Sequence, residues 1–309
     1  MGLLDVAGLT DDQAHQELCK LRWPENDGEA VCPDCGCCES YKITTRQRFK
    51  CTACGKMYSV TSGTIFSGRK LSHRQLLLAI FLFANGAKGL PALELARTLN
   101  IHPKSAFVLL HKLREAIESA RKDVMLEGIV EIDGAYFGGS TRPPNAGRSG
   151  KKVAGQAEEK PRKLCVIAMV ERKGQAIPLI ASSETRDAAM EAARRHIRPG
   201  STVAADEHGA YNVLHSRYEM LRINHSEAYA DGLACTNQAE SFHSRMRRAE
   251  IGQYHHMSGV YLHRYAHEMA FRHSRRTSDN GSIYREMTGL ALIHPVSREW
   301  KGYWQKRSV

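Results

Sequence analysis

The sequence has no apolar run long enough to cross a membrane. Its longest run, "LLLAIFLFA" at 76–84, is much shorter than the roughly 20 residues that a membrane helix needs. The N-terminus has no basic region followed by an apolar stretch, and Val6 stands where an N-myristoylation signal requires Ser or Thr. We therefore expect a soluble intracellular protein without membrane contact.

The sequence also lacks the motifs of several enzyme classes and is short of acidic residues. We find no convincing Gly-rich phosphate loop, Ser-His-Asp set or thiol nucleophile. The 33 Asp and Glu face 44 Lys and Arg, so the formal net charge is +11, which favours a polyanionic partner such as nucleic acid. With 309 residues, 42% of them hydrophobic, the chain is large enough for two or three compact units.

Nine cysteines without a secretion signal indicate reduced thiols or a metal site. Two C-x2-C pairs have the spacing of a four-thiolate zinc site, in which each pair turns two sulfurs toward one tetrahedral ion. The predicted zinc ligands are Cys32, Cys35, Cys51 and Cys54. We expect one structural Zn²⁺ in a ribbon over 31–66, with Cys37 and Cys38 as further thiols. Scattered thiols or a redox C-x2-C are the alternatives.

Helices are predicted on both sides of the ribbon. An N-terminal helical segment over 1–30 contains one helix from about Thr10 to Leu21. Region 70–122 begins with a buried helix after a Ser72 cap and continues as two helices around 100–102, which we interpret as a helix-turn-helix. On its second helix, Ser105 and His111 are expected to be free to meet DNA, together with the predicted DNA-binding residues Lys104 and Lys112. A plain αα-hairpin is the alternative.

Beyond Gly128 the pattern changes to that of an α/β domain. Four strands and one helix are predicted; the strands are 128–137, 162–174, 176–184 and 201–207, and the helix is 186–197. The second and third strands should form a hairpin. The loop 138–163 is basic and has few apolar residues, so we expect DNA contact through Lys151 and Lys152, with an inert linker as the alternative.

Two aspartates stand near the carboxyl ends of predicted neighbouring strands, where such sheets expose their clefts. They are Asp133 and Asp206; a helix from 236–237 adds Glu240 in its first turns. Three such acids can hold two Mg²⁺ (or Mn²⁺) ions for attack on a phosphodiester, although turn or capping aspartates are common. Four histidines could form a second metal site, but we expect them on a helix surface: His255, His256, His263 and His267.

Several motifs together resemble the transposases of bacterial insertion sequences that join an N-terminal zinc ribbon to a DDE domain. They are "VEIDGAYFGG", "INHSEAYADG" before "TNQAES", and "IGQYHHMSGVYLHRYAHEMAFRHSRR". The resemblance implies a ribonuclease-H-like mixed sheet with flanking helices over 128–276, followed by a C-terminal tail at 277–309. It also implies Asp133, Asp206 and Glu240 as the catalytic triad, and a homo-oligomer that binds the inverted-repeat ends and target double-stranded DNA in the bacterial cytoplasm, at the nucleoid.

The sequence departs from this family at several positions. Cys235 stands where the family commonly has His, and Arg247 and Arg248 follow Met246 where Leu-Lys-Arg is common. Both arginines are predicted to bind DNA. Some relatives use Asn in the third catalytic role, so Asn237 could share or replace the role of Glu240. A non-catalytic zinc and helix-turn-helix regulator, or a structure-specific nuclease, are the competing functions.

Overall fold

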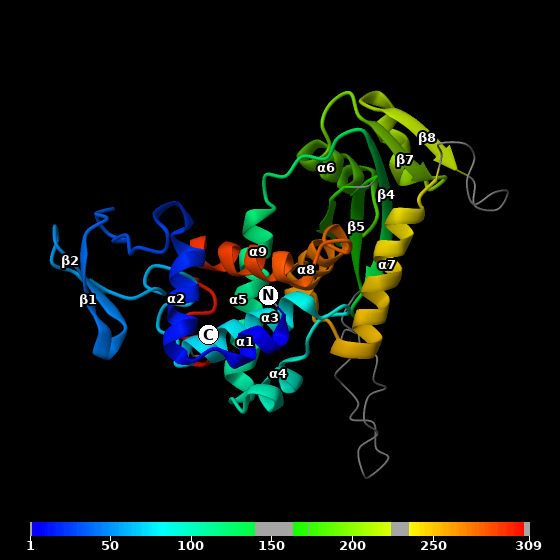
Figure 1. Cartoon of the computed structure of the whole chain (residues 1–309). Coiled ribbons are helices and arrows are strands. Elements are labelled where there is room, and N and C mark those ends of the chain that lie inside the picture. The colour runs from blue at the N-terminus through cyan, green and yellow to red at the C-terminus, as the bar shows by residue number, and fades with distance from the viewer. Residues whose placement is uncertain (1, 140–162, 173, 224–234, 306–309) are drawn as a thin grey trace, which may run out of the picture. The chain divides into compact units, whose positions relative to one another are not determined.

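The computed structural model describes residues 2–139, 163–172, 174–223 and 235–305. The chain divides into two compact units, which Figure 1 draws in one colour gradient from N- to C-terminus. Met1–Ala120 and Arg275–Val309 form the first, called here the helical unit, and Arg121–Ser274 form the second, called the sheet unit.

The helical unit is built from six α-helices in the described part of the chain. They are α1 (Leu3–Gly8), α2 (Asp11–Arg22), α3 (His73–Asn85), α4 (Ala92–Leu99), α5 (Pro103–Ala120) and α9 (Asn280–Ile293). Local capping explains two of the starts, because the side chain of Thr10 accepts from Gln13 N–H and that of Ser72 accepts from Gln75 N–H. Both predicted helix starts are thus confirmed.

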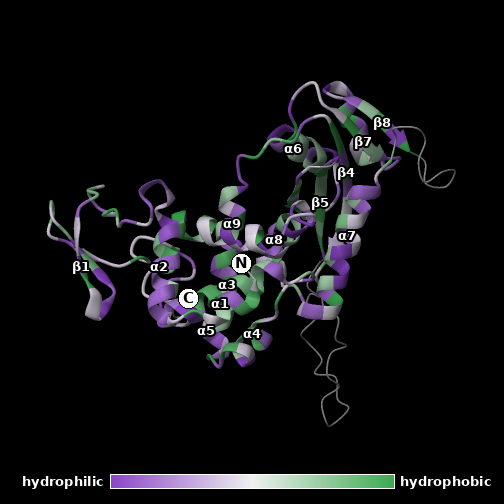
Figure 2. Cartoon of the chain, in the orientation of Figure 1, coloured by the Kyte–Doolittle hydropathy of each residue, from purple (hydrophilic) through white to green (hydrophobic). Residues whose placement is uncertain are grey.

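Helix α3 forms the centre of this unit and is hydrophobic nearly all round (Figure 2). Helix α9 packs on it, and the rings of Phe81 and Tyr284 lie 5.5 Å apart. The C-terminal segment 277–309 therefore contributes a core helix that the sequence analysis did not predict. No helix in the described ranges is both long and apolar enough to cross a bilayer.

The ribbon belongs to the helical unit and consists of three antiparallel strands. They are β1 (Ser40–Ile43), β2 (Arg48–Cys51) and β3 (Met57–Tyr58), in the order β1-β2-β3. Arg22, at the end of α2, donates from its guanidinium to the carbonyls of Val60 (2.5 Å) and Ser62 (2.6 Å). These bonds fix the chain after β3 to α2, so the ribbon is attached by more than its covalent ends.

The sheet unit contains a five-stranded mixed sheet in the order β6-β5-β4-β7-β8. The strands are β4 (Ile129–Phe137), β5 (Leu164–Glu171), β6 (Ala176–Ala181), β7 (Thr202–Asp206) and β8 (Glu219–Ile223). The first three are antiparallel, with the predicted hairpin between β5 and β6, and β7 and β8 run parallel to β4. The predicted ribonuclease-H-like mixed sheet is confirmed; β8 is not among the four strands named in the sequence analysis.

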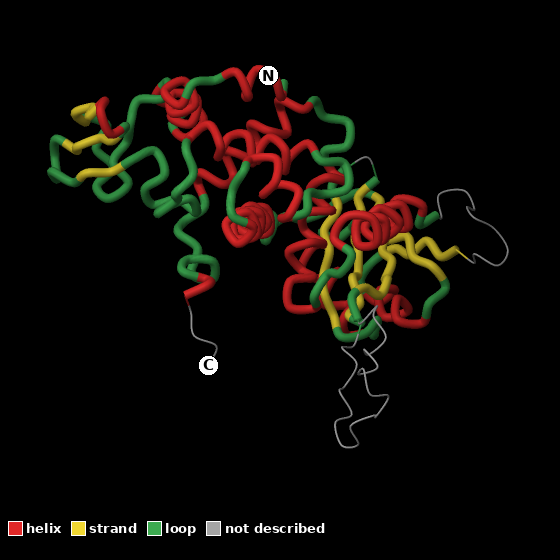
Figure 3. Tube along the Cα trace, turned by 90° about the horizontal axis from the view of Figure 1, so that it is seen from below, coloured by secondary structure: helices red, strands yellow, loops and turns green. Residues whose placement is uncertain are grey.

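Helices cover both faces of this sheet (Figure 3). On one face, Ile132 shares a core with alanines of α6 (Arg186–His196). On the other, Phe137 shares a core with Phe242 of α7 (Asn237–Ala249) and Met269 of α8 (Leu262–Ser274). Because side chains alternate along a strand, the odd-numbered residues of β4 lie on the α7 face.

Candidate active site and metal centre

The two predicted strand aspartates are neighbours across the sheet. Strands β4 and β7 run parallel, with Ile132 opposite Ala205, so the next residues along the two strands are Asp133 and Asp206. Asp133 lies on the α7 face, where its Oδ1 accepts from Gly134 N–H at 2.9 Å. The predicted placement of the two aspartates on adjacent strands is therefore confirmed, and Asp206 is the last residue of β7, but Asp133 lies in the middle of β4 and not near its carboxyl end as expected.

Asp133 lies in an environment that disfavours its charge. Burial, followed by the negative charges of Asp206 and Glu184, raises the pKa of Asp133 to about 7, and Glu240 acts in the same direction. A divalent cation would relieve this repulsion, and carboxylate oxygens are the ligands that Mg²⁺ prefers. The carboxylates around Asp133 thus fit Mg²⁺ both in their negative charge and in their oxygen ligands.

The pKa of Asp133 predicts a pH-dependent effect of Asp133→Asn on stability. In the unfolded chain the Asp133 carboxyl has its ordinary pKa of 3.8, whereas in the folded protein its pKa is about 7, so the folded state binds the proton more tightly. The resulting contribution to the free energy of unfolding is complete below pH 3.8 and is lost as the pH rises through 7. Without added divalent ions, Asp133→Asn should raise the melting temperature at pH 8 and give no such gain below pH 3.8. Thermal unfolding should show no gain for the exposed control Asp123→Asn; a variant that melts below wild type at pH 8 contradicts this account.

Helix α7 presents the third predicted acid. Glu240 and Asn237 are both exposed in its first turn, and the Thr236 hydroxyl donates to Oε1 of Glu240 at 3.0 Å. Arg247 and Arg248 are exposed two turns later. Within the described ranges, the carboxylate oxygens of the three acids do not lie as close to one another as the sulfurs of the zinc ligands described below; the acids are Asp133, Asp206 and Glu240.

Three buried or half-buried polar side chains around the aspartates were not singled out from the sequence. Glu184 accepts from the Tyr211 hydroxyl at 2.5 Å, and its carboxylate lies where a Cβ on Gly134 would point. His243 lies 3.1 Å from the Asp133 carbonyl through Nε2, and its burial lowers its pKa to about 4, so the ring is neutral and donates. The third, Glu131, is two residues before Asp133 on the same face of β4.

The four predicted zinc ligands come together in the ribbon. Their sulfurs all lie within 4.8 Å of one another; the Cys32–Cys54 distance is 3.7 Å and the Cys35–Cys51 distance is 3.5 Å. A tetrahedral ion with Zn–S bonds of about 2.3 Å requires sulfurs about 3.8 Å apart. Backbone N–H groups of Asp34 and Cys35 lower the pKa of Cys32 to about 7, which favours the ligating thiolate. The geometry excludes scattered thiols.

The predicted DNA-contact residues differ in exposure. Lys104 is exposed at the start of α5, and Lys112 is half-buried. The expectation that His111 is free to meet DNA is wrong, because its ring is fully buried and stacks on Trp300 at 4.5 Å. Lys151, Lys152 and nearly all of the basic loop lie outside the described residues.

The four histidines expected at the surface differ in exposure: His255 and His256 are exposed, whereas His263 and His267 are half-buried on helix α8. Desolvation lowers the pKa of His267 to about 3, so its ring is neutral. The sequence alternates polar and apolar residues there, which gave no sign of how much of the helix is covered.

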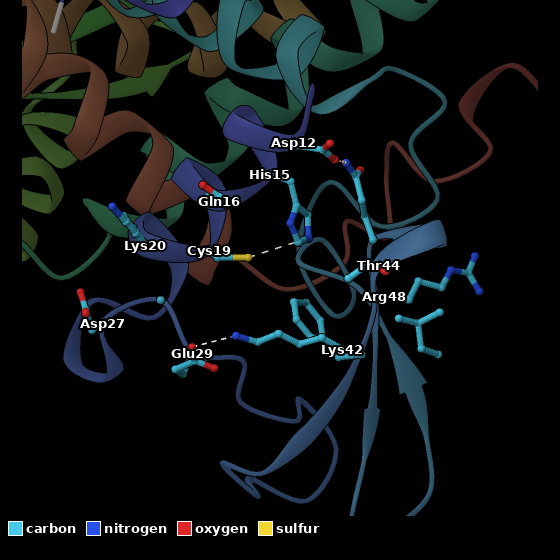
Figure 4. A pocket seen from close by; sticks show the side chains of 14 residues that line it. Asp12, His15, Gln16, Cys19, Lys20, Asp27, Glu29, Lys42, Thr44 and Arg48 are labelled. Carbon is cyan, nitrogen blue, oxygen red and sulfur yellow. Dashed lines mark hydrogen bonds and ion pairs between the residues drawn. The ribbon is translucent and has the colours of Figure 1, made fainter. Parts of the chain in front are cut away.

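A cavity of about 510 Å³ lies between α2 and the ribbon (Figure 4). Lys42 Nζ pairs with Glu29 Oε1 at 2.8 Å, and Cys19 Sγ lies 3.8 Å from His15 Nε2. The Cys–His pair resembles an activated nucleophile, but burial raises the pKa of Cys19 to about 12, so the thiol stays protonated and poorly nucleophilic. Arg48 adds a positive side chain at the rim.

Two family models match the chain. Residues 125–274 match an ISXO2-like transposase domain, and residues 9–57 match a transposase zinc-ribbon domain. The first match coincides closely with the sheet unit, and the second covers α2 and most of the ribbon. A search of curated proteins found no match.

Proposed function

Because the chain belongs to the transposases that combine a zinc ribbon with an ISXO2-like transposase domain, we propose that it binds the terminal inverted repeats of a bacterial insertion sequence and cuts and joins DNA strands there. The observation that carries this proposal is the Asp133–Asp206 pair, placed side by side on parallel strands with the charge on Asp133 disfavoured. Such a pair suits a cation-dependent phosphodiester reaction better than a structural role.

Asp133 and Asp206 would hold two Mg²⁺ ions with Glu240 or Asn237 as the third group. Bound there, the ions would activate the attacking oxygen and stabilise the leaving oxygen. In the first step water attacks the phosphodiester at the element end and a 3′-hydroxyl leaves. In the second, this hydroxyl attacks target DNA and displaces a new 3′-hydroxyl, so the number of phosphodiester bonds is conserved and no covalent protein intermediate is needed.

The protein's own side chains orient this reaction. His243 donates to the backbone carbonyl of Asp133 and so fixes the strand at the catalytic carboxylate. Arg247 lies with its guanidinium 5.9 Å from the Phe137 ring, on the exposed side of α7, where a DNA backbone can reach it. The ribbon and the α4–α5 pair of the helical unit would select the repeat sequence.

One prediction concerns the phosphate contacts. Arg247→Gln should weaken binding to all DNA sequences alike and lower the slope of log K against log salt by about one, because one counterion fewer is released. Arg195→Gln is the matched control, since Arg195 lies on α6, on the opposite face of the sheet, and pairs with Glu191. Fluorescence anisotropy over a salt series measures both slopes. Equal slopes for Arg247→Gln and wild type would show that Arg247 does not contact the DNA phosphates.

The decisive test uses precut DNA ends taken from the sequences that flank the gene. The proposed transposase joins such ends to a target plasmid in Mg²⁺, whereas a structure-specific nuclease cuts DNA without joining, and a non-catalytic regulator binds without doing either. Terminal inverted repeats and a short target duplication in the flanking DNA would give independent support.

A further inference from the structure

Glu131 is a buried carboxylate beside the proposed catalytic centre. It lies on β4, two residues before Asp133 and on the same face, and its side chain is only 1% exposed. An ionised carboxylate at such a depth is costly unless charged and hydrogen-bonding partners satisfy it. Arg172, just after β5, is the first partner, with its Nε 3.0 Å from Oε1 of Glu131.

The second set of partners is the start of helix α7. Oε2 of Glu131 accepts from Gln238 N–H at 2.6 Å and from Ala239 N–H at 3.3 Å. The first N–H groups of a helix need acceptors from outside the helix, and a negative charge there also interacts favourably with the helix dipole. Glu131 therefore acts as the cap of α7, although it comes from a strand more than a hundred residues earlier.

Helix α7 has a further attachment to the same strand. His243 Nε2 donates to the carbonyl of Asp133 at 3.1 Å, a little more than one turn after the amides that Glu131 binds. Glu240 lies between these two attachment points, and Asn237 lies directly before the first. The position of either candidate for the third catalytic group is therefore set by how α7 is docked on β4.

We infer that Glu131 is a positioning residue for the proposed reaction: paired with Arg172, it holds the start of α7 so that the third catalytic group lies beside Asp133. This inference rests on the proposed function. It assigns no DNA or metal contact to Glu131 itself. The thiol of Cys235 contacts both partners of this ion pair, at 2.8 Å from Nη2 of Arg172 and 3.6 Å from Oε1 of Glu131. Cys235, which stands where the family commonly has His, therefore belongs to the contacts that hold the start of α7.

The test uses full-length protein and Mn²⁺-dependent nicking of supercoiled plasmid, with Mn²⁺ binding measured separately by calorimetry without DNA. Glu131→Gln should weaken Mn²⁺ binding and nicking by about 10- to 100-fold, the usual effect of losing a residue that orients metal ligands. Glu191→Gln, an exposed change on α6, should leave both unchanged.

A double variant separates positioning from simple stabilisation. Glu131→Gln alone leaves Arg172 without its carboxylate partner and should lower the melting temperature. Adding Arg172→Gln removes the unpaired positive charge and should restore part of the lost melting temperature. Mn²⁺ binding and nicking should stay low in the double variant. Glu131→Asp, which keeps the charge but shortens its reach to α7, should also fold and show weakened Mn²⁺ binding.

Two results would overturn the inference. One is a double variant that binds Mn²⁺ and nicks like wild type; the other is a Glu131→Asp variant that does so. Failure of the proposed function looks different, because Asp133→Asn would then nick plasmid at the wild-type rate whatever happens at Glu131.

Discussion

Replacing Asp133 or Asp206 with Asn should reduce DNA strand cleavage by about a thousandfold or more while binding to repeat ends stays nearly intact. Each substitution removes a charged oxygen that the proposed metal centre needs, and neither changes the exposed basic residues of α7. Single-turnover cleavage and anisotropy binding on one preparation separate the two effects. Cleavage within tenfold of wild type by either variant would exclude that aspartate from the site.

The same assay identifies the third group. Glu240→Gln should be as inactive as the aspartate variants if Glu240 holds that role, with Asn237→Ala as the competing variant. If Glu240→Gln still cleaves and Asn237→Ala does not, the role belongs to Asn237. Glu227, in a segment outside the described residues, should tolerate Gln; if Glu227→Gln alone is inactive, the assignment to α7 is wrong.

Loss of zinc should unfold the ribbon. Cys32 and Cys51 are buried, and the three described strands of the ribbon bury only two large apolar side chains, Phe49 and Tyr58, so the metal supplies much of the stability there; structural zinc sites contribute about 10 kcal/mol or more of apparent binding free energy. Metal analysis should find about one zinc per chain. The Cys32→Ser, Cys51→Ser double variant should lose the zinc, become protease-sensitive before residue 66 and lose its preference for repeat ends.

The matched controls are the two other thiols of the ribbon. Cys37 and Cys38 lie outside the group of four gathered sulfurs, so Cys37→Ser and Cys38→Ser should keep one zinc per chain. Zinc unchanged in the double variant, or lost in either control, would contradict the assignment of ligands.

The parts of this protein that could be predicted from sequence depend on local patterns. Thr10 and Ser72 begin helices through bonds to residues three positions away, and the two C-x2-C pairs determine their own geometry. Asp133 and Asp206 could be paired because each follows a short apolar run on strands that were expected to be neighbours, although β4 continues for four residues beyond Asp133.

The parts that were missed depend on contacts between distant segments. Glu131 reads as one polar position in an apolar strand, and its role becomes visible only when the start of α7 is seen against it. Glu184 lies in a loop and is brought to Gly134 by the fold. His111 has the spacing of an exposed helix position, but Trp300, far along the chain, covers it. Periodicity along one helix carries no information about such partners.

The central claim is that Asp133 and Asp206 form the metal centre of an enzyme that cuts and joins DNA. Anomalous scattering from crystals soaked in Mn²⁺ tests this claim most directly. We expect a manganese peak within bonding distance, about 2.2 Å, of a carboxylate oxygen from each aspartate, and its loss in crystals of Asp133→Asn. Manganese bound only at other sites, with both carboxylates left without an ion at saturating Mn²⁺, would contradict the account.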